Sequence, residues 1–176
     1  ESFGSRIDTF EIDAYYIRGD WTLQGQLAWG RIEDGAANGD AQWSGLSALA
    51  AYNFTPRLKG TLRADYLKND KNGGGLFGSV PFCADDDCSL LVADGRNGFG
   101  PRMVFDEDTA TWGPDASGKG NNRYAVSMGL SYLYGLNTTF KVEYRLDGAS
   151  GNAFIGAQGN YRKTNHLLGT SVVVNF

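Results

Sequence analysis

Apolar residues recur at every second position through most of positions 46–67, LSALAAYNFTPRLKGTLRADYL. A period of two residues is that of a β-strand, in which successive side chains point to opposite faces of a sheet. The pattern is interrupted once, at Thr55-Pro56-Arg57, which predicts two antiparallel strands joined by a tight turn. On the second strand the polar positions include Lys59, Arg63 and Asp65. The stretch therefore predicts a hairpin with one apolar face and one charged face.

The same alternation recurs along the chain and predicts seven strands, over 9–18, 21–32, 46–54, 58–67, 123–134, 140–147 and 165–176. The connections alternate in length. The short turns fall at 19–20, 55–57 and 135–137, and the long polar loops at 33–41, 69–122 and 148–163. A structureless stretch as long as 69–122 is unusual inside a compact soluble domain but ordinary as an external loop of a membrane barrel.

Aromatic residues gather at two levels along the predicted strands. One group lies at the short-turn end: Tyr16, Trp21, Tyr52, Phe54, Tyr132, Tyr134 and Phe176. The other lies toward the long loops: Phe10, Trp29, Tyr66 and Tyr124. Small and aliphatic residues separate the two groups. Two aromatic girdles around an apolar band are what a lipid bilayer selects.

Composition excludes several classes of protein. A net charge of -4 argues against a partner made of nucleic acid. No apolar run approaches the roughly 20 residues that a membrane-spanning helix requires. The chain begins at Glu1 without a methionine or a signal-peptide pattern, so we expect a processed, truncated or partly represented N-terminus.

The last strand carries a more specific signal, because alternating Val172 and Val174 lead to a terminal Phe176. This ending resembles the C-terminal signature of Gram-negative outer-membrane β-barrel proteins. Together with the short turns and long loops, the pattern resembles porins over nearly the whole chain. The resemblance implies an all-β, antiparallel, up-and-down transmembrane β-barrel, with 1–176 as one domain or its C-terminal portion. It implies the bacterial outer membrane, with short turns in the periplasm and 69–122 as a long extracellular loop.

The resemblance also implies partners and a strand count. The partners are outer-membrane lipid and lipopolysaccharide, the barrel-assembly machinery acting on the C-terminal strand, and further subunits of a homotrimer; no cofactor is implied. Seven strands are an odd number, whereas single-chain bacterial barrels have even numbers. Two interpretations stay open. The chain is the C-terminal portion of a larger barrel of about 12 to 18 strands, or an eight-stranded barrel with one strand inside 69–122.

Charged residues on the strands fall almost entirely at inward-facing positions. These predicted pore-lining residues are Glu11, Asp13, Lys59, Arg63, Asp65, Lys141, Glu143, Arg145 and Asp147. Counting from the turns places Lys59 and Lys141 at similar depth, with Arg63 and Arg145 above them. Two interpretations compete here. The charges neutralise one another in a polar interior, or they form a pore wall that biases ion selectivity and guides anionic solutes.

Other side chains offer little chemistry. Cys83 and Cys88 predict a local disulfide, which we favour over a metal site built with Asp85, Asp86 and Asp87, because this segment lacks the histidines or further cysteines that zinc sites use. His166 is the single histidine, and no catalytic constellation is evident. We therefore predict neither an enzyme nor a metal site.

Three functions follow from this pattern. The first is a porin with a water-filled channel for passive diffusion of small ions and solutes. The second is a closed or plugged outer-membrane barrel that acts as a structural or binding protein through its extracellular loops. The third is a soluble extracellular β-sandwich, which the apolar face of 124–134 disfavours.

Overall fold

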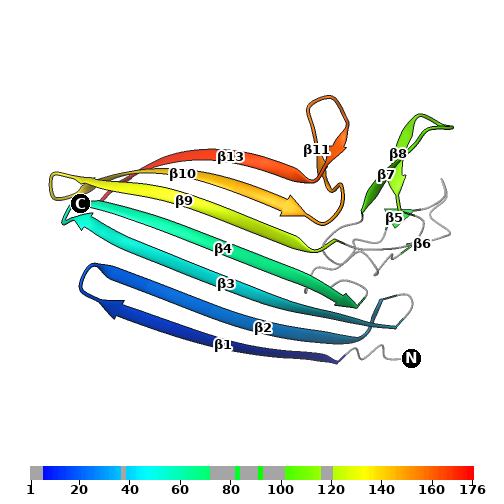
Figure 1. The fold of residues 1–176 in the computed structure, drawn as a ribbon, viewed down its shortest axis with the longest axis horizontal. Coiled ribbons are helices and arrows are strands. Elements are labelled where there is room, and N and C mark those ends of the chain that lie inside the picture. The colour runs from blue at the N-terminus through cyan, green and yellow to red at the C-terminus, as the bar shows by residue number, and fades with distance from the viewer. Residues whose placement is uncertain (1–5, 37–38, 72–81, 84–90, 93–101, 116–120) are drawn as a thin grey trace.

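The computed structural model describes residues 6–36, 39–71, 82–83, 91–92, 102–115 and 121–176. Its main feature is one antiparallel sheet in the strand order β1-β2-β3-β4-β9-β10-β13 (Figure 1). The bounds of these strands are β1 Ile7–Arg18, β2 Trp21–Ala36, β3 Gly39–Thr55, β4 Leu58–Lys71, β9 Arg123–Tyr134, β10 Thr138–Ala149 and β13 Thr164–Val174. Each strand pairs with the next long strand along the chain. The predicted all-β fold with seven antiparallel strands is confirmed.

The short turns form where the sequence places them, and local chemistry explains each of the three. Gly19 and Gly135 adopt positive φ angles of 56° and 65°, which glycine reaches without a steric penalty. At the third turn the hydroxyl of Thr55 accepts hydrogen bonds from the backbone amides of Arg57 and Leu58, at 3.2 and 3.0 Å. These three turns set the register of the three hairpins that they close.

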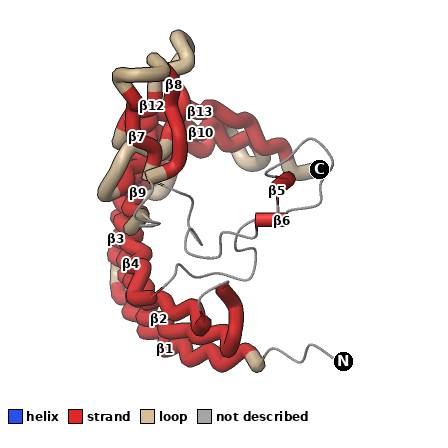
Figure 2. The backbone as a smooth tube through the Cα atoms, turned by 90° about the vertical axis from the view of Figure 1, so that its right-hand side faces the viewer, coloured by secondary structure: helices blue, strands red, loops and turns tan. Residues whose placement is uncertain are grey.

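The seven strands bend into an open arc and do not close on themselves (Figure 2). Strands β1 and β13 lie at opposite edges of the sheet. The predicted barrel is therefore not closed by these strands alone, because closure would require the two edge strands to pair. In the described part of the chain, the short strands between β4 and β9 form separate two-stranded sheets, and β4 pairs directly with β9. No described strand of 69–122 supplies the eighth strand of a small barrel.

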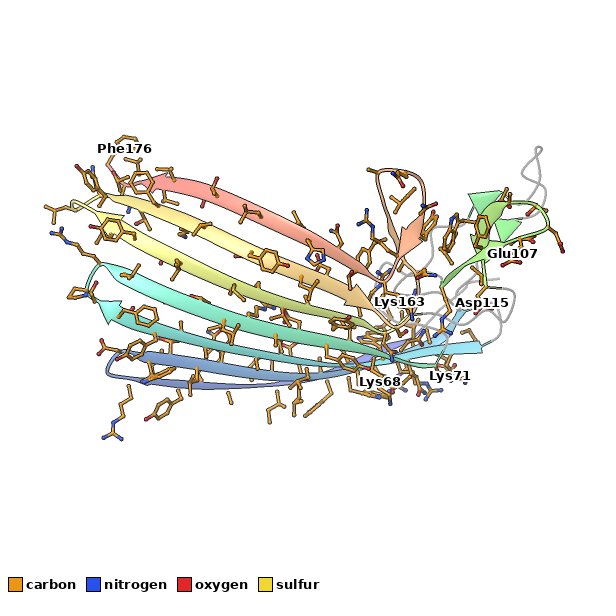
Figure 3. All side chains as sticks on the ribbon, turned by 45° about the horizontal axis from the view of Figure 1, so that its top comes forward. Lys68, Lys71, Glu107, Asp115, Lys163 and Phe176 are labelled. Carbon is orange, nitrogen blue, oxygen red and sulfur yellow. The ribbon has the colours of Figure 1, made fainter. Side chains whose placement is uncertain are left out.

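Among the described residues, the main sheet is a single layer without a hydrophobic core. The buried apolar residues among those described are all alanines: Ala41, Ala51, Ala125 and Ala149. Large apolar side chains such as Phe10 and Met128 are instead 64% and 55% exposed. Side chains stand on both sides of the ribbon (Figure 3). A soluble domain would cover such a face with a second layer.

Two outer hairpins dock against each other at the long-loop end. Strands β7 (Met103–Asp106) and β8 (Thr111–Pro114) form the first, and β11 (Phe154–Ile155) and β12 (Tyr161–Arg162) form the second. The amide of Met103 donates to the carbonyl of Asn152 at 2.8 Å, and the rings of Trp112 and Tyr161 lie 5.5 Å apart. The segment predicted as a single loop over 69–122 thus contains ordered structure.

The boundaries of that loop differ from the prediction. Strand β4 continues to Lys71, so the connection starts after it. Strands β5 (Phe82–Cys83) and β6 (Leu91–Val92) pair with each other inside the connection. Cys88 lies outside the described residues, so the Cys83–Cys88 disulfide stays a prediction.

A second difference concerns the predicted loop 33–41, most of which is strand. The pairing of β2 with β3 extends past Ile32 to the pair Ala36 and Gly39, after a shift in register. Asp34 lies in this irregular part and adopts a positive φ of 50°. The carboxylate of Asp40 stabilises this irregular end. It accepts from the Asp34 amide at 3.2 Å and from the Arg31 guanidinium at 2.8 Å, and Lys71 lies 3.9 Å away.

These contacts predict a pH dependence at the long-loop end. The Asp34 amide and the Arg31 guanidinium hold the pKa of Asp40 below its ordinary value of 3.8. Because the folded-state pKa is depressed, the carboxylate stabilises this end above pH 3.8 and loses its effect as pH falls through the depressed pKa. We expect the NMR shift of the Asp34 amide proton to titrate with a midpoint below 3.8, and Asp40→Asn to abolish that step. A midpoint at or above the ordinary value would contradict the network.

Candidate functional site

All nine predicted pore-lining residues lie on one face of the sheet, which we call the charged face. Residues directly opposite each other on neighbouring strands share a face. One row of the register runs Asp13, Gln26, Ser47, Asp65, Ala125 and Asp147 across six strands. Glu11 lies two residues from Asp13, and its carboxylate accepts from the Gln26 amide at 2.7 Å. The remaining charges alternate along β4 and β10 on the same side.

The rows across β4, β9 and β10 set the order of charge along the face. Lys59 and Lys141 both pair with Ser131, which agrees with the equal depth predicted for them. The next row holds Thr61, Gly129 and Glu143, and the row after it holds Arg63, Ser127 and Arg145. The row of Asp65 and Asp147 follows. A row containing Glu143 therefore separates the lysines from the arginines, which sequence counting did not resolve.

Arg63 and Arg145 each form an ion pair along their own strand. The Nε atom of Arg63 lies 2.9 Å from Asp65, and the Nε atom of Arg145 lies 2.7 Å from Asp147. The Ser47 hydroxyl also donates to Asp65 at 2.6 Å. The interpretation of mutually neutralising charges thus holds for these two pairs. Lys59, Lys141 and Glu143 make no ion pair with any residue that the structure describes.

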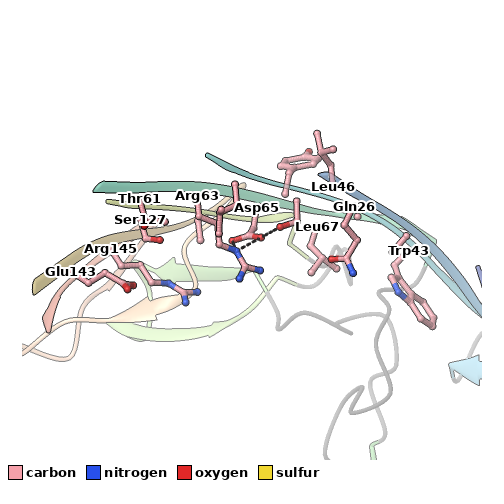
Figure 4. A pocket seen from close by; sticks show the side chains of 16 residues that line it. Gln26, Trp43, Leu46, Thr61, Arg63, Asp65, Leu67, Ser127, Glu143 and Arg145 are labelled. Carbon is pink, nitrogen blue, oxygen red and sulfur yellow. Dashed lines mark hydrogen bonds and ion pairs between the residues drawn. The ribbon is translucent and has the colours of Figure 1, made fainter. Parts of the chain in front are cut away.

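The charged face lines the concave side of the arc and encloses a concavity of about 610 Å³. Figure 4 shows Arg63, Arg145 and Glu143 projecting to this side, whereas Leu46 projects to the other. The lining also includes Gln26, Trp43 and Ser47, which the sequence analysis did not single out. The sequence could have identified them, because each lies at the same alternate positions of its strand, β2 or β3, as the other polar residues.

The opposite side of the sheet, which we call the apolar face, carries the predicted girdle residues. At the short-turn end Trp21 and Tyr52 have ring centroids 4.7 Å apart, and Tyr52 and Phe54 5.3 Å apart. At the long-loop end Tyr66 pairs directly with Tyr124. The remaining predicted girdle residues on the strands are between 41% and 64% exposed: Phe10, Tyr16, Trp29, Tyr132 and Tyr134. Phe176 lies beyond β13 and is fully exposed.

Glycines on the apolar face make room for two of these rings. A Cβ atom at Gly60 would lie 2.6 Å from the Phe54 ring, and one at Gly148 would overlap the Tyr124 ring. A side chain at either position would displace the ring. One further pair is polar: the hydroxyl of Tyr144 lies 2.6 Å from His166 Nδ1. Among the described residues, no cluster of His, Cys, Asp or Glu could hold a metal ion. That the protein binds no metal stays a prediction.

A comparison with protein families assigns the chain. The model of a family described as "Protein of unknown function (DUF3138)" matches residues 4–176. The chain belongs to the DUF3138 family. No curated protein and no solved structure matches this DUF3138 chain. In the described residues of the DUF3138 chain, no helix is long and apolar enough to cross a membrane.

Proposed function

We propose that the chain forms part of the wall of an outer-membrane porin, a water-filled channel for passive diffusion of small ions and solutes. One observation carries the proposal. The apolar face is exposed on the convex side of the arc, and the charged face lines the concave side. A soluble protein would instead expose its charged face and cover its apolar face, because water favours exposed charge and disfavours exposed apolar surface.

Strand length and backbone pairing support the same function. A membrane-spanning strand needs about 9–11 residues, and the strands of the main sheet contain 11 to 17. Strands in globular proteins usually contain about 5–6. Within hydrocarbon every backbone polar group requires a partner, which paired strands provide everywhere except at edges. Since β1 and β13 are edges, we propose that further strands complete a larger barrel.

The orientation follows from the loops. The long-loop end carries the docked hairpins β7–β8 and β11–β12, and we place it on the extracellular side. We place the three short turns in the periplasm. The charged face then lines the lumen, and the girdle residues lie at the two membrane interfaces.

A second candidate function is a closed or plugged barrel that binds a partner through its extracellular loops. The two docked hairpins favour it, because they present a folded outer surface rather than separate strands. The Trp112–Tyr161 contact and the Met103–Asn152 bridge hold that surface together. Such a barrel would hold a partner without passing ions.

Conductance separates the two functions. The full-length protein refolded into planar bilayers should give stepwise single-channel currents and should admit small sugars in a vesicle-swelling assay. The same protein added after heat denaturation serves as the control. Correctly folded protein that never conducts would overturn the channel and leave the plugged barrel.

A further inference from the structure

The charged face carries the same motif twice. Strand β4 reads K-x-x-x-R-x-D over 59–65, and β10 reads K-x-x-x-R-x-D over 141–147. The register aligns the two copies residue for residue, because each pair of equivalent positions faces the same residue of β9. Strand β9 contributes only alanine, glycine and serine between the copies, at 125, 127, 129 and 131. Nothing on β9 therefore fills the space between the two arginines.

The aspartates orient both guanidinium groups without forming hydrogen bonds to their terminal nitrogens. Arg63 donates from Nε to both carboxylate oxygens of Asp65, at 3.0 and 2.9 Å. Arg145 donates from Nε to Asp147 at 2.7 Å. In the part of the chain that the structure describes, no terminal nitrogen of either arginine is bonded, and the two side chains are 51% and 49% exposed. Each arginine thus presents its terminal edge to the concavity.

We propose that this pair of arginines forms a binding subsite for a small dicarboxylate. The terminal edge of a guanidinium group fits one carboxylate with two parallel hydrogen bonds. Arg63 and Arg145 both pair with Ser127, so their backbones lie about two strand spacings, roughly 10 Å, apart. Both side chains project to the same concave side (Figure 4). A solute with a carboxylate at each end can therefore engage one arginine with each.

The charge within the two motif copies favours an anion, whereas the whole charged face, with Glu11 and Asp13 on β1, is nearly balanced. The two motif copies place four cations, Lys59, Arg63, Lys141 and Arg145, against three carboxylates, Asp65, Glu143 and Asp147. Both aspartates occupy the row beyond the arginines, and each contacts its arginine through Nε and not through the terminal nitrogens. The inference rests on the proposed function, because it names the class of solute recognised by the same channel wall.

Calorimetric titration of the full-length protein in detergent tests the subsite with succinate and acetate at equal ionic strength. We expect succinate to bind at least about tenfold more tightly than acetate, because only a dicarboxylate engages both arginines. The double substitution Arg63→Gln with Arg145→Gln should remove this preference. Arg57→Gln, at the turn between β3 and β4, removes the same type of side chain outside the charged face and should leave succinate binding unchanged.

The outcomes separate this subsite from the channel itself. Equal affinities for succinate and acetate would overturn the subsite, and so would succinate binding that survives the double substitution. Protein that conducts ions without preferring succinate would support the channel and contradict the subsite. Protein that prefers succinate without ever conducting ions would support the subsite and contradict the channel.

Discussion

Replacing Met128 with lysine should destabilise the membrane-inserted protein by about 2–4 kcal/mol, which is the cost of a lysine at the bilayer midplane on the lipid face of a barrel. Met128 lies near the centre of β9 on the apolar face and is 55% exposed. Girdle residues Tyr124 and Tyr132 lie on either side of it along the same strand. The cost arises because the ammonium group would have to leave water for hydrocarbon.

The neighbouring residue provides a matched control. Gly129 lies on the charged face, where it pairs with Thr61 and Glu143, and a Cβ atom there meets only ordinary contacts. Gly129→Lys should be near neutral, since its ammonium group would point into the proposed lumen beside a carboxylate. Denaturant titration of the full-length protein in phospholipid vesicles measures both variants. If the convex face met water, Met128→Lys would stay within about 0.5 kcal/mol, as exposed substitutions usually do.

The sequence predicted the seven strands and their faces because a single rule governs both. With a period of two, the identity of Lys59, Arg63 and Asp65 fixes the face of every other residue on β4. The short turns then carry that assignment to the neighbouring strands, since Gly19 and Gly135 reach the positive φ angles that tight connections use. Equal distances from the turns were enough to place Lys59 and Lys141 in one row.

Other features depend on contacts that no local pattern encodes. The loop 33–41 is shorter than predicted because a register shift and the positive φ of Asp34 let β2 and β3 continue where alternation fails. The docking of β7–β8 depends on Met103 meeting Asn152, residues far apart in a stretch without a period. Closure is likewise not encoded in alternation, because a flat sheet, an arc and a barrel share the same period.

The charged face likewise has features that the sequence predicts and features that it does not. Alternation placed all nine charged residues on one face, and the register of the sheet also has them on one face. It did not show that Asp65 and Asp147 bond to Nε, because that depends on side-chain rotamers along each strand. In the proposed channel, this pairing would determine how much charge Arg63 and Arg145 present to a passing ion.

Reversing both arginines should therefore shift ion selectivity toward cations. Arg63→Glu with Arg145→Glu replaces two positive charges with two negative ones and leaves Asp65 and Asp147 without their partners. In water a unit charge about 4 Å from an ion's path is worth about 1 kcal/mol, or on the order of fivefold in local ion occupancy. With both side chains half-exposed on the concave face, we expect the reversal potential in a salt gradient to move clearly in the cation-selective direction.

The control for this experiment reverses a charge outside the charged face. Arg57→Glu, in the turn between β3 and β4, should shift the reversal potential much less. Raising the salt concentration should shrink the shift caused by the double variant, because the Debye length falls from about 10 Å at 0.1 M to about 3 Å at 1 M. A double variant with unchanged selectivity at low salt would mean that ions pass too far from this wall to sense it. The two ion pairs would then serve only to neutralise a polar interior.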